Sequence, residues 1–134
     1  MMRLAGMFAE LSVLRPPTPQ PSIHDHIAAG QLPDAEDVIR YLRAGHRLIA
    51  AMGGNDDVLD PAEYVMNGDS VLTDGTWLWR ADLAHYLDRH HVELPAEFLE
   101  LIRSRDYTVP AMDKADLAAC AEYAGHLVFF GEDE

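Results

Sequence analysis

The chain lacks several features that would assign it to a class of protein, beginning with cysteine. Its 134 residues contain one cysteine, Cys120, which excludes a disulfide bond within the chain and fits a reducing compartment. The apolar segment 4–14 is too short for a membrane span and is interrupted by Glu10. A single arginine precedes this segment, and no small-residue cleavage site of the secretory type follows it. We therefore expect a cytoplasmic protein with no membrane partner.

Basic residues are also scarce. Lys114 is the only lysine beside nine arginines, and 23 acidic residues bring the formal net charge to -13. An acidic surface repels phosphate backbones, so we expect no nucleic-acid partner. The same surface attracts basic proteins and accelerates their encounter. The charge therefore has two interpretations, which are solubility alone and recognition of a basic protein partner.

Recognisable catalytic motifs are missing as well. No serine lies in a G-x-S-x-G sequence, and Gly53-Gly54 is too short for a phosphate-binding loop and lacks a following lysine. Cys120 falls on the apolar stripe of a predicted helix, where a buried thiol is normally inert. The sequence thus favours a protein that is not an enzyme, and it assigns no catalytic residue and no cofactor.

The strongest structural signal that is present is a β-hairpin over residues 69–80. Asp74-Gly75 is typical of a two-residue type I′ turn, which places Leu72 opposite Trp77. Because side chains alternate along a strand, Leu72, Trp77 and Trp79 share one face, and the other face carries apolar residues too. Two strands alone are marginally stable, so helices or a further strand must cover the hairpin.

The two tryptophans have two interpretations. Large aromatic side chains usually belong to the core. An exposed pair would instead form a platform for a partner, or for a second copy of the chain in a homo-oligomer. On the second interpretation the candidate binding residues are Trp77 and Trp79 with Asp82 and His85 from the helix that follows.

Helical spacing of apolar residues predicts four helices, so we expect an α+β fold in one domain spanning residues 1–134. The first helix carries Gly45 on its apolar stripe, which indicates that another element crosses closely there. Asn55–Gly68 is polar and rich in turn residues, with a short helical turn expected at 61–66. An extended proline-rich strap (1–22) and an acidic tail (131–134) flank the core. The predicted helices, which would cover one face of a small antiparallel sheet, are 34–52, 81–91, 95–105 and 113–124, and a strand at 126–130 could extend that sheet.

Seven histidines raise the alternative of metal binding. His24 and His26 form an H-x-H pattern, His85 lies within the helix predicted at 81–91, and His91 lies at its C-terminal end. No H-E-x-x-H or C-x-x-C spacing accompanies them. A metal-dependent enzyme would require at least three of these four histidines to converge. Acids in the 56–60 loop do not follow the EF-hand pattern, and we expect them to be solvated.

The hairpin and the segments after it resemble a group of small uncharacterised bacterial proteins. The shared residues are L-T-D-G-x-W-x-W at 72–79, L-A-x-Y at 83–86 and L-P-x-E-F at 94–98. The resemblance covers residues 65–100 and extends toward the 34–52 helix. It implies a single α+β unit and supplies no site residues. Some members of the group resemble companions of toxin or mobile-element systems.

These observations lead to a functional hypothesis and an alternative. The first is a non-enzymatic protein-binding module, immunity- or antitoxin-like, whose acidic face engages a basic partner. The alternative is a small metal-binding enzyme that depends on histidine.

Overall fold

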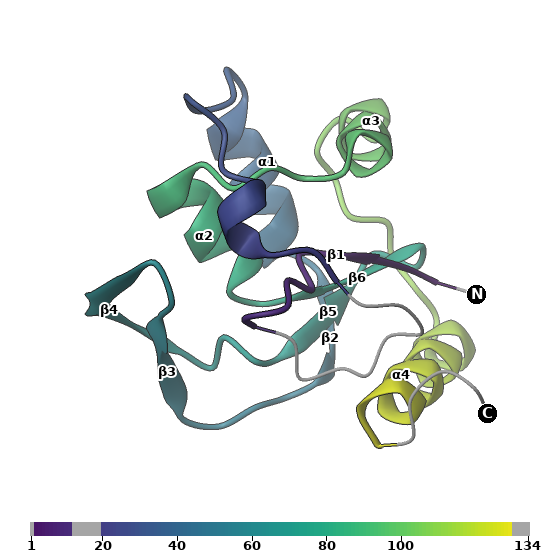
Figure 1. Ribbon diagram of the computed structural model, residues 1–134. Helices are drawn as coiled ribbons and strands as arrows, with labels where there is room; N and C mark the ends of the chain where they lie inside the picture. Colours follow the sequence, from purple (N-terminus) through teal and green to yellow (C-terminus); the bar gives the residue numbers. More distant parts are fainter. Residues whose placement is uncertain (1, 12–19, 130–134) are drawn as a thin grey trace.

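The computed structural model describes residues 2–11 and 20–129, with the side chains of 128 and 129 left aside (Figure 1). The α+β class with four helices is confirmed in this part of the chain. Residues 12–19 of the expected proline-rich strap (1–22) and the whole acidic tail lie outside the described residues. Residues 2–11 do not flank the core as expected, because Arg3–Ala5 form a strand and Met7, Phe8 and Leu11 are buried in the core. In chain order the elements are β1 (Arg3–Ala5), the 3-10 helix η1 (Ile23–Asp25), α1 (Ala35–Arg43), β2 (His46–Ile49), β3 (Gly54–Asp57), β4 (Asp60–Met66), β5 (Val71–Thr73), β6 (Trp77–Arg80), α2 (Leu83–His90), α3 (Ala96–Ser104) and α4 (Lys114–Phe129).

A four-stranded sheet in the order β1-β6-β5-β2 divides the apolar core in two. The residues of β5 and β6 pair antiparallel, whereas β1 pairs parallel with β6. Trp77 and Trp79 lie in the larger cluster, which α1, α2 and α3 cover, while Val71 and Leu78 point into the smaller one, which α4 covers. Figure 1 shows α4 on the opposite side of the sheet from the other three helices. The expectation that all four helices share one face is therefore corrected.

The central hairpin keeps its predicted faces but not its predicted register. Leu72 pairs with Trp79, two residues further along than expected. The reason is the Asp74 side chain, whose Oδ1 accepts hydrogen bonds from the backbone N–H groups of Thr76 and Trp77 and so widens the loop. A shift of two residues preserves the alternation of faces, so both tryptophans still point to the same side.

The first predicted helix is corrected, because α1 ends at Arg43 and residues 46–49 form β2 instead. The strand gains pairing with β5, starting with His46 opposite Thr73. The close crossing expected at Gly45 is confirmed, since a Cβ atom there would lie 2.6 Å from Cζ2 of Trp79. Met52, the last residue of the helix predicted at 34–52, is 94% exposed.

The polar segment after β2 is a second hairpin, so the helical turn expected at 61–66 is wrong. Strands β3 and β4 form a separate two-stranded sheet, which Figure 1 shows beside the main body. Asp57 closes its turn, because Oδ1 accepts from the backbone N–H groups of Leu59 and Asp60.

The predicted strand at 126–130 is also wrong for the residues that are described. Helix α4 continues through Gly125 to Phe129, because Ala124 and Leu127 pack at helical spacing against the sheet. Residue 130 lies outside the described residues. At the other end of α4, Asp113 caps the helix, with Oδ1 accepting from Asp116 N at 2.8 Å.

Asp34, just before α1, connects that helix to α3 and to the segment after it, and gives the first testable prediction. Its carboxylate accepts from Arg103 Nε at 2.9 Å and from the Tyr107 hydroxyl at 2.6 Å. The hydrogen bond from Arg103 and then that from Tyr107 lower the pKa of Asp34 from 3.8 to about 2. We expect Asp34→Asn to lower the free energy of unfolding by about 1 kcal/mol at pH 7, after allowance for solvent screening.

The pH dependence of that loss follows from the direction of the shift. A carboxylate with a lowered pKa contributes its stability above pH 3.8 and loses it as the pH falls toward 2. The difference between wild type and Asp34→Asn should therefore be constant above about pH 5 and shrink below pH 4. Urea unfolding at pH 7, 5 and 3 measures it. A difference that is the same at all three values contradicts the assignment.

Candidate functional site

Three side chains from β3 and α2 converge at the turn of the second hairpin. Asp57 Oδ2 lies 2.7 Å from His85 Nε2 and 2.6 Å from His90 Nε2. The ligand atoms of this group all lie within 4.8 Å of one another, and no other His, Cys, Asp or Glu group of three does so among the described residues. We call Asp57, His85 and His90 the hairpin–helix cluster.

The surroundings of the cluster fix the carboxylate firmly. The Asp57 side chain is fully buried, while each histidine side chain is 20% exposed. Burial pushes the pKa of Asp57 upward, but hydrogen bonds from His85, Leu59 N and His90 outweigh it and hold that pKa below its usual value. The carboxylate thus stays ionised and faces two imidazole nitrogens.

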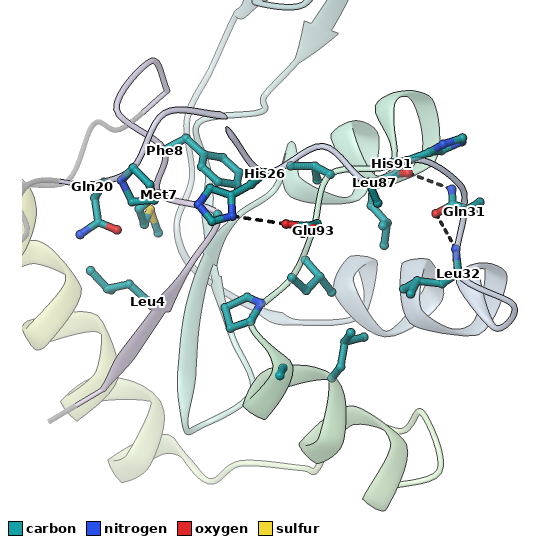
Figure 2. Close-up of a pocket in the computed structure, with 18 of the residues that line it drawn as sticks. Leu4, Met7, Phe8, Gln20, His26, Gln31, Leu32, Leu87, His91 and Glu93 are labelled. Atoms are coloured by element: carbon teal, nitrogen blue, oxygen red, sulfur yellow. Dashed lines mark hydrogen bonds and ion pairs between the residues drawn. The ribbon is translucent and has the colours of Figure 1, made fainter. Parts of the chain in front are cut away.

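Of the four histidines predicted as metal ligands, only His85 belongs to this cluster. His24 is exposed on η1, and His26 and His91 line a different cavity of about 620 Å³. Figure 2 shows His26 facing Glu93 across this cavity, and the Nδ1–Oε1 distance between them is 3.5 Å. His90 and Asp57 were not predicted as ligands.

The other predicted binding residues are buried. Trp77 is 3% exposed and Trp79 is not exposed at all, so the interpretation of both rings as core is confirmed. Trp79 Nε1 donates to Leu42 O at 3.0 Å, which satisfies the only polar group of the indole. Asp82 lies beneath the surface as the partner of Arg80. Neither tryptophan therefore offers a surface to a partner.

Arg80 is a buried cation that lines a second cavity, of about 350 Å³, between the second hairpin and the main body. Its Nε and Nη2 atoms donate to both oxygens of Asp82, at 3.1 and 2.8 Å, and Nη2 also donates to Asp69. Within the described residues, Nη1 has no hydrogen-bond partner. A carbonyl, a carboxylate or a water molecule would satisfy this atom.

The exposed apolar side chains gather on the second hairpin. Five large apolar residues are exposed in the described part of the chain, and four of them lie between residues 52 and 66. Tyr64 and Met66 alternate along β4, and Met66 pairs with Gly54. The Tyr64 ring lies over that glycine, since a Cβ on Gly54 would be 2.8 Å from Tyr64 Cε2. We call Tyr64 and Met66 the hairpin patch.

The segment that carries the hairpin patch is acidic in sequence. Residues 52–69 contain no lysine, arginine or histidine. Asp56 is exposed and pairs with Tyr64, so the two side chains share a face of the hairpin. The acidic residues of this stretch are Asp56, Asp57, Asp60, Glu63 and Asp69. Of these, Asp57 is buried against His85 and His90, Glu63 pairs with Arg89, and Asp69 pairs with Arg80. This leaves Asp56 as the exposed carboxylate beside Tyr64.

Comparison of the chain with known protein families, curated proteins and solved structures finds no match. Among the described residues, no helix has both the length and the apolar character needed to cross a membrane.

Proposed function

We propose that the protein is a protein-binding module that recognises a basic partner through the hairpin patch. The observation that supports it is the concentration of exposed apolar side chains on one acidic hairpin. Aromatic and methionine side chains are enriched at the centres of interfaces, where they supply most of the binding energy. A methionine also adapts its shape to different contacts.

The charge around the patch favours a basic partner. An apolar surface beside the exposed carboxylate of Asp56 attracts a lysine- or arginine-rich surface and disfavours an acidic one. The formal net charge of -13 adds a long-range attraction that salt weakens. A companion that covers a basic toxin, as an immunity protein or an antitoxin does, is the concrete form of this proposal.

The opposite face of the hairpin supports its use as a rigid platform. Asn55 Nδ2 donates to Asp69 Oδ1 at 2.8 Å, and the backbone N–H of Val58 donates to the Tyr86 hydroxyl at 2.9 Å. These contacts attach the hairpin to the main body while Tyr64 and Met66 stay 60% and 62% exposed. A pre-organised surface loses little entropy on binding.

Site-specific photo-crosslinking tests the proposal. A photoreactive residue at position 64 should capture a basic protein in lysate of the native host, and added salt should weaken the capture. The same residue at Ala118, which is exposed on α4, serves as the matched control. Identical products from both positions, or an acidic product at position 64, would contradict the proposal.

Charge reversal at single positions distinguishes the contribution of the hairpin to partner binding from that of the net charge. We expect Asp56→Lys to reduce partner binding by about 10-fold or more, whereas Glu100→Lys, with the same charge change on α3, should have a much smaller effect. Both residues are exposed, so the stability of each variant should stay within about 0.5 kcal/mol of wild type. Titration of the captured partner by calorimetry measures both affinities. Equal losses in the two variants would mean that net charge, and not the hairpin, controls binding.

A further inference from the structure

The hairpin–helix cluster is a second site, independent of the hairpin patch. We propose that Asp57, His85 and His90 bind one divalent transition metal ion of the zinc type. The observation behind it is that two imidazole Nε2 atoms approach the same carboxylate oxygen, at 2.7 and 2.6 Å. Two imidazoles and a carboxylate are a common protein ligand set for such ions.

The geometry needs little adjustment to accept the ion. Zinc lies about 2.0–2.2 Å from nitrogen and oxygen ligands, so tetrahedral ligands are about 3.3 Å apart. The three ligand atoms here lie within 4.8 Å of one another, and the two short contacts need only lengthen by less than about 1 Å. Each neutral imidazole that binds through Nε2 carries its proton on Nδ1, so the metal takes the place of the two N–H···O hydrogen bonds.

The carboxylate is already held in the orientation that a ligand requires. Its Oδ1 atom accepts from Leu59 N at 2.7 Å and from Asp60 N at 3.2 Å, which leaves Oδ2 for the histidines. Such contacts to the far side of a ligand fix its position and strengthen metal binding.

The two rings are positioned by a shared neighbour. Tyr86 lies between them in the sequence, with its ring centroid 5.3 Å from that of His85 and 5.9 Å from that of His90. Its hydroxyl is anchored by Val58 N from the same hairpin turn. The partial exposure of both histidines leaves an entry path from solvent.

The ligand set selects among metals. Magnesium and calcium favour oxygen ligands, whereas zinc, cobalt and nickel accept imidazole. Three protein ligands leave at least one coordination position for water, as in open zinc sites. The ion would also join the hairpin turn to α2, because its ligands come from both elements.

Titration of the chelator-treated full chain with Zn²⁺ and Co²⁺ tests the site. We expect one ion per chain, and a visible absorption band for the Co²⁺ form. His85→Gln/His90→Gln should weaken binding by about 100-fold or more. His24→Gln, at an exposed histidine on η1, should leave the affinity unchanged.

A measurement on the wild type keeps the test valid if the double variant folds poorly. Added Zn²⁺ should shift the imidazole NMR signals of His85 and His90 and leave those of His24 in place. Absence of binding by the wild type, equal shifts of all histidines, or unchanged affinity in a folded double variant would each overturn the proposal.

Discussion

Asp74→Ala should lower the free energy of unfolding by about 3–4 kcal/mol. The Asp74 side chain is fully buried, and four groups depend on it. Its Oδ1 accepts from the N–H groups of Thr76 and Trp77, and its Oδ2 accepts from the Tyr41 hydroxyl at 2.6 Å. Arg105 Nη1 lies 3.1 Å from Oδ2 as an ionic partner. Removal of the carboxylate leaves buried donors without an acceptor. The free-energy penalty of these unsatisfied donors exceeds the net stability that their hydrogen bonds contribute in the wild type.

Asp113→Ala is the matched control for this prediction. Asp113 also accepts a backbone N–H, but it is exposed and serves only the start of α4. The loss of such a cap costs about 1 kcal/mol. Urea unfolding of both variants and the wild type measures the difference. A loss for Asp74→Ala no larger than that for Asp113→Ala would show that the buried network adds nothing beyond one capping bond.

Arg80→Met should destabilise the protein by about 3–5 kcal/mol at pH 7. The side chain of Arg80 is 3% exposed and that of its partner Asp82 is 6% exposed. Burial already raises the pKa of Asp82, and the hydrogen bond and charge of Arg80 only partly oppose it. Without the guanidinium, the carboxylate stays buried beside Asp69 with its strongest partner removed.

Two comparisons identify the cause of that loss. Arg80→Met/Asp82→Asn removes the charge of Asp82 and should recover a large part of the stability. A group whose pKa is raised by folding favours the native state below its unfolded pKa, and this advantage is lost as the pH rises through the folded pKa. The deficit of Arg80→Met relative to wild type should therefore shrink from pH 7 toward pH 4. If the loss of stability is independent of pH and persists in the double variant, its cause is the lost packing of the Arg80 side chain and not the buried charge of Asp82.

Local patterns in the sequence predicted the framework of the fold. The i, i+3, i+4 spacing of Leu83, Tyr86 and Leu87 places α2 correctly, and all three are buried. The alternation of Leu72, Trp77 and Trp79 predicts correctly that these side chains share one face of the hairpin, but not that α4 covers the other face. The register between β5 and β6 depends on which backbone N–H groups bond to the Asp74 side chain. The Asp-Gly pair in the sequence does not reveal these bonds.

The errors come from segments whose neighbours decide their structure. Residues 46–49 continue a helical stripe, yet pairing with β5 makes them a strand. Residues 126–129 are β-prone, yet packing of Leu127 against the sheet keeps them helical. Intrinsic preference is a weak guide where tertiary contacts differ from it.

The hairpin–helix cluster joins residues too distant in sequence for spacing to predict. Asp57 lies 28 residues from His85 and 33 from His90, in a segment whose polar composition suggested a solvated loop. The short run of apolar residues at Tyr64, Val65 and Met66 was the available signal for a strand there. It would have indicated a second hairpin, but not that its turn contacts α2.

During synthesis on the ribosome, β1 leaves the exit tunnel well before its partner strand has been made. Arg3–Ala5 pairs with Trp77–Trp79, about 70 residues later. At 5–20 residues per second, the first strand waits for roughly 4–15 s. Met7, Phe8 and Leu11, which are buried in the finished fold, remain uncovered for the same interval. The nascent chain therefore presents an apolar segment that a chaperone can bind until β6 emerges and the sheet closes.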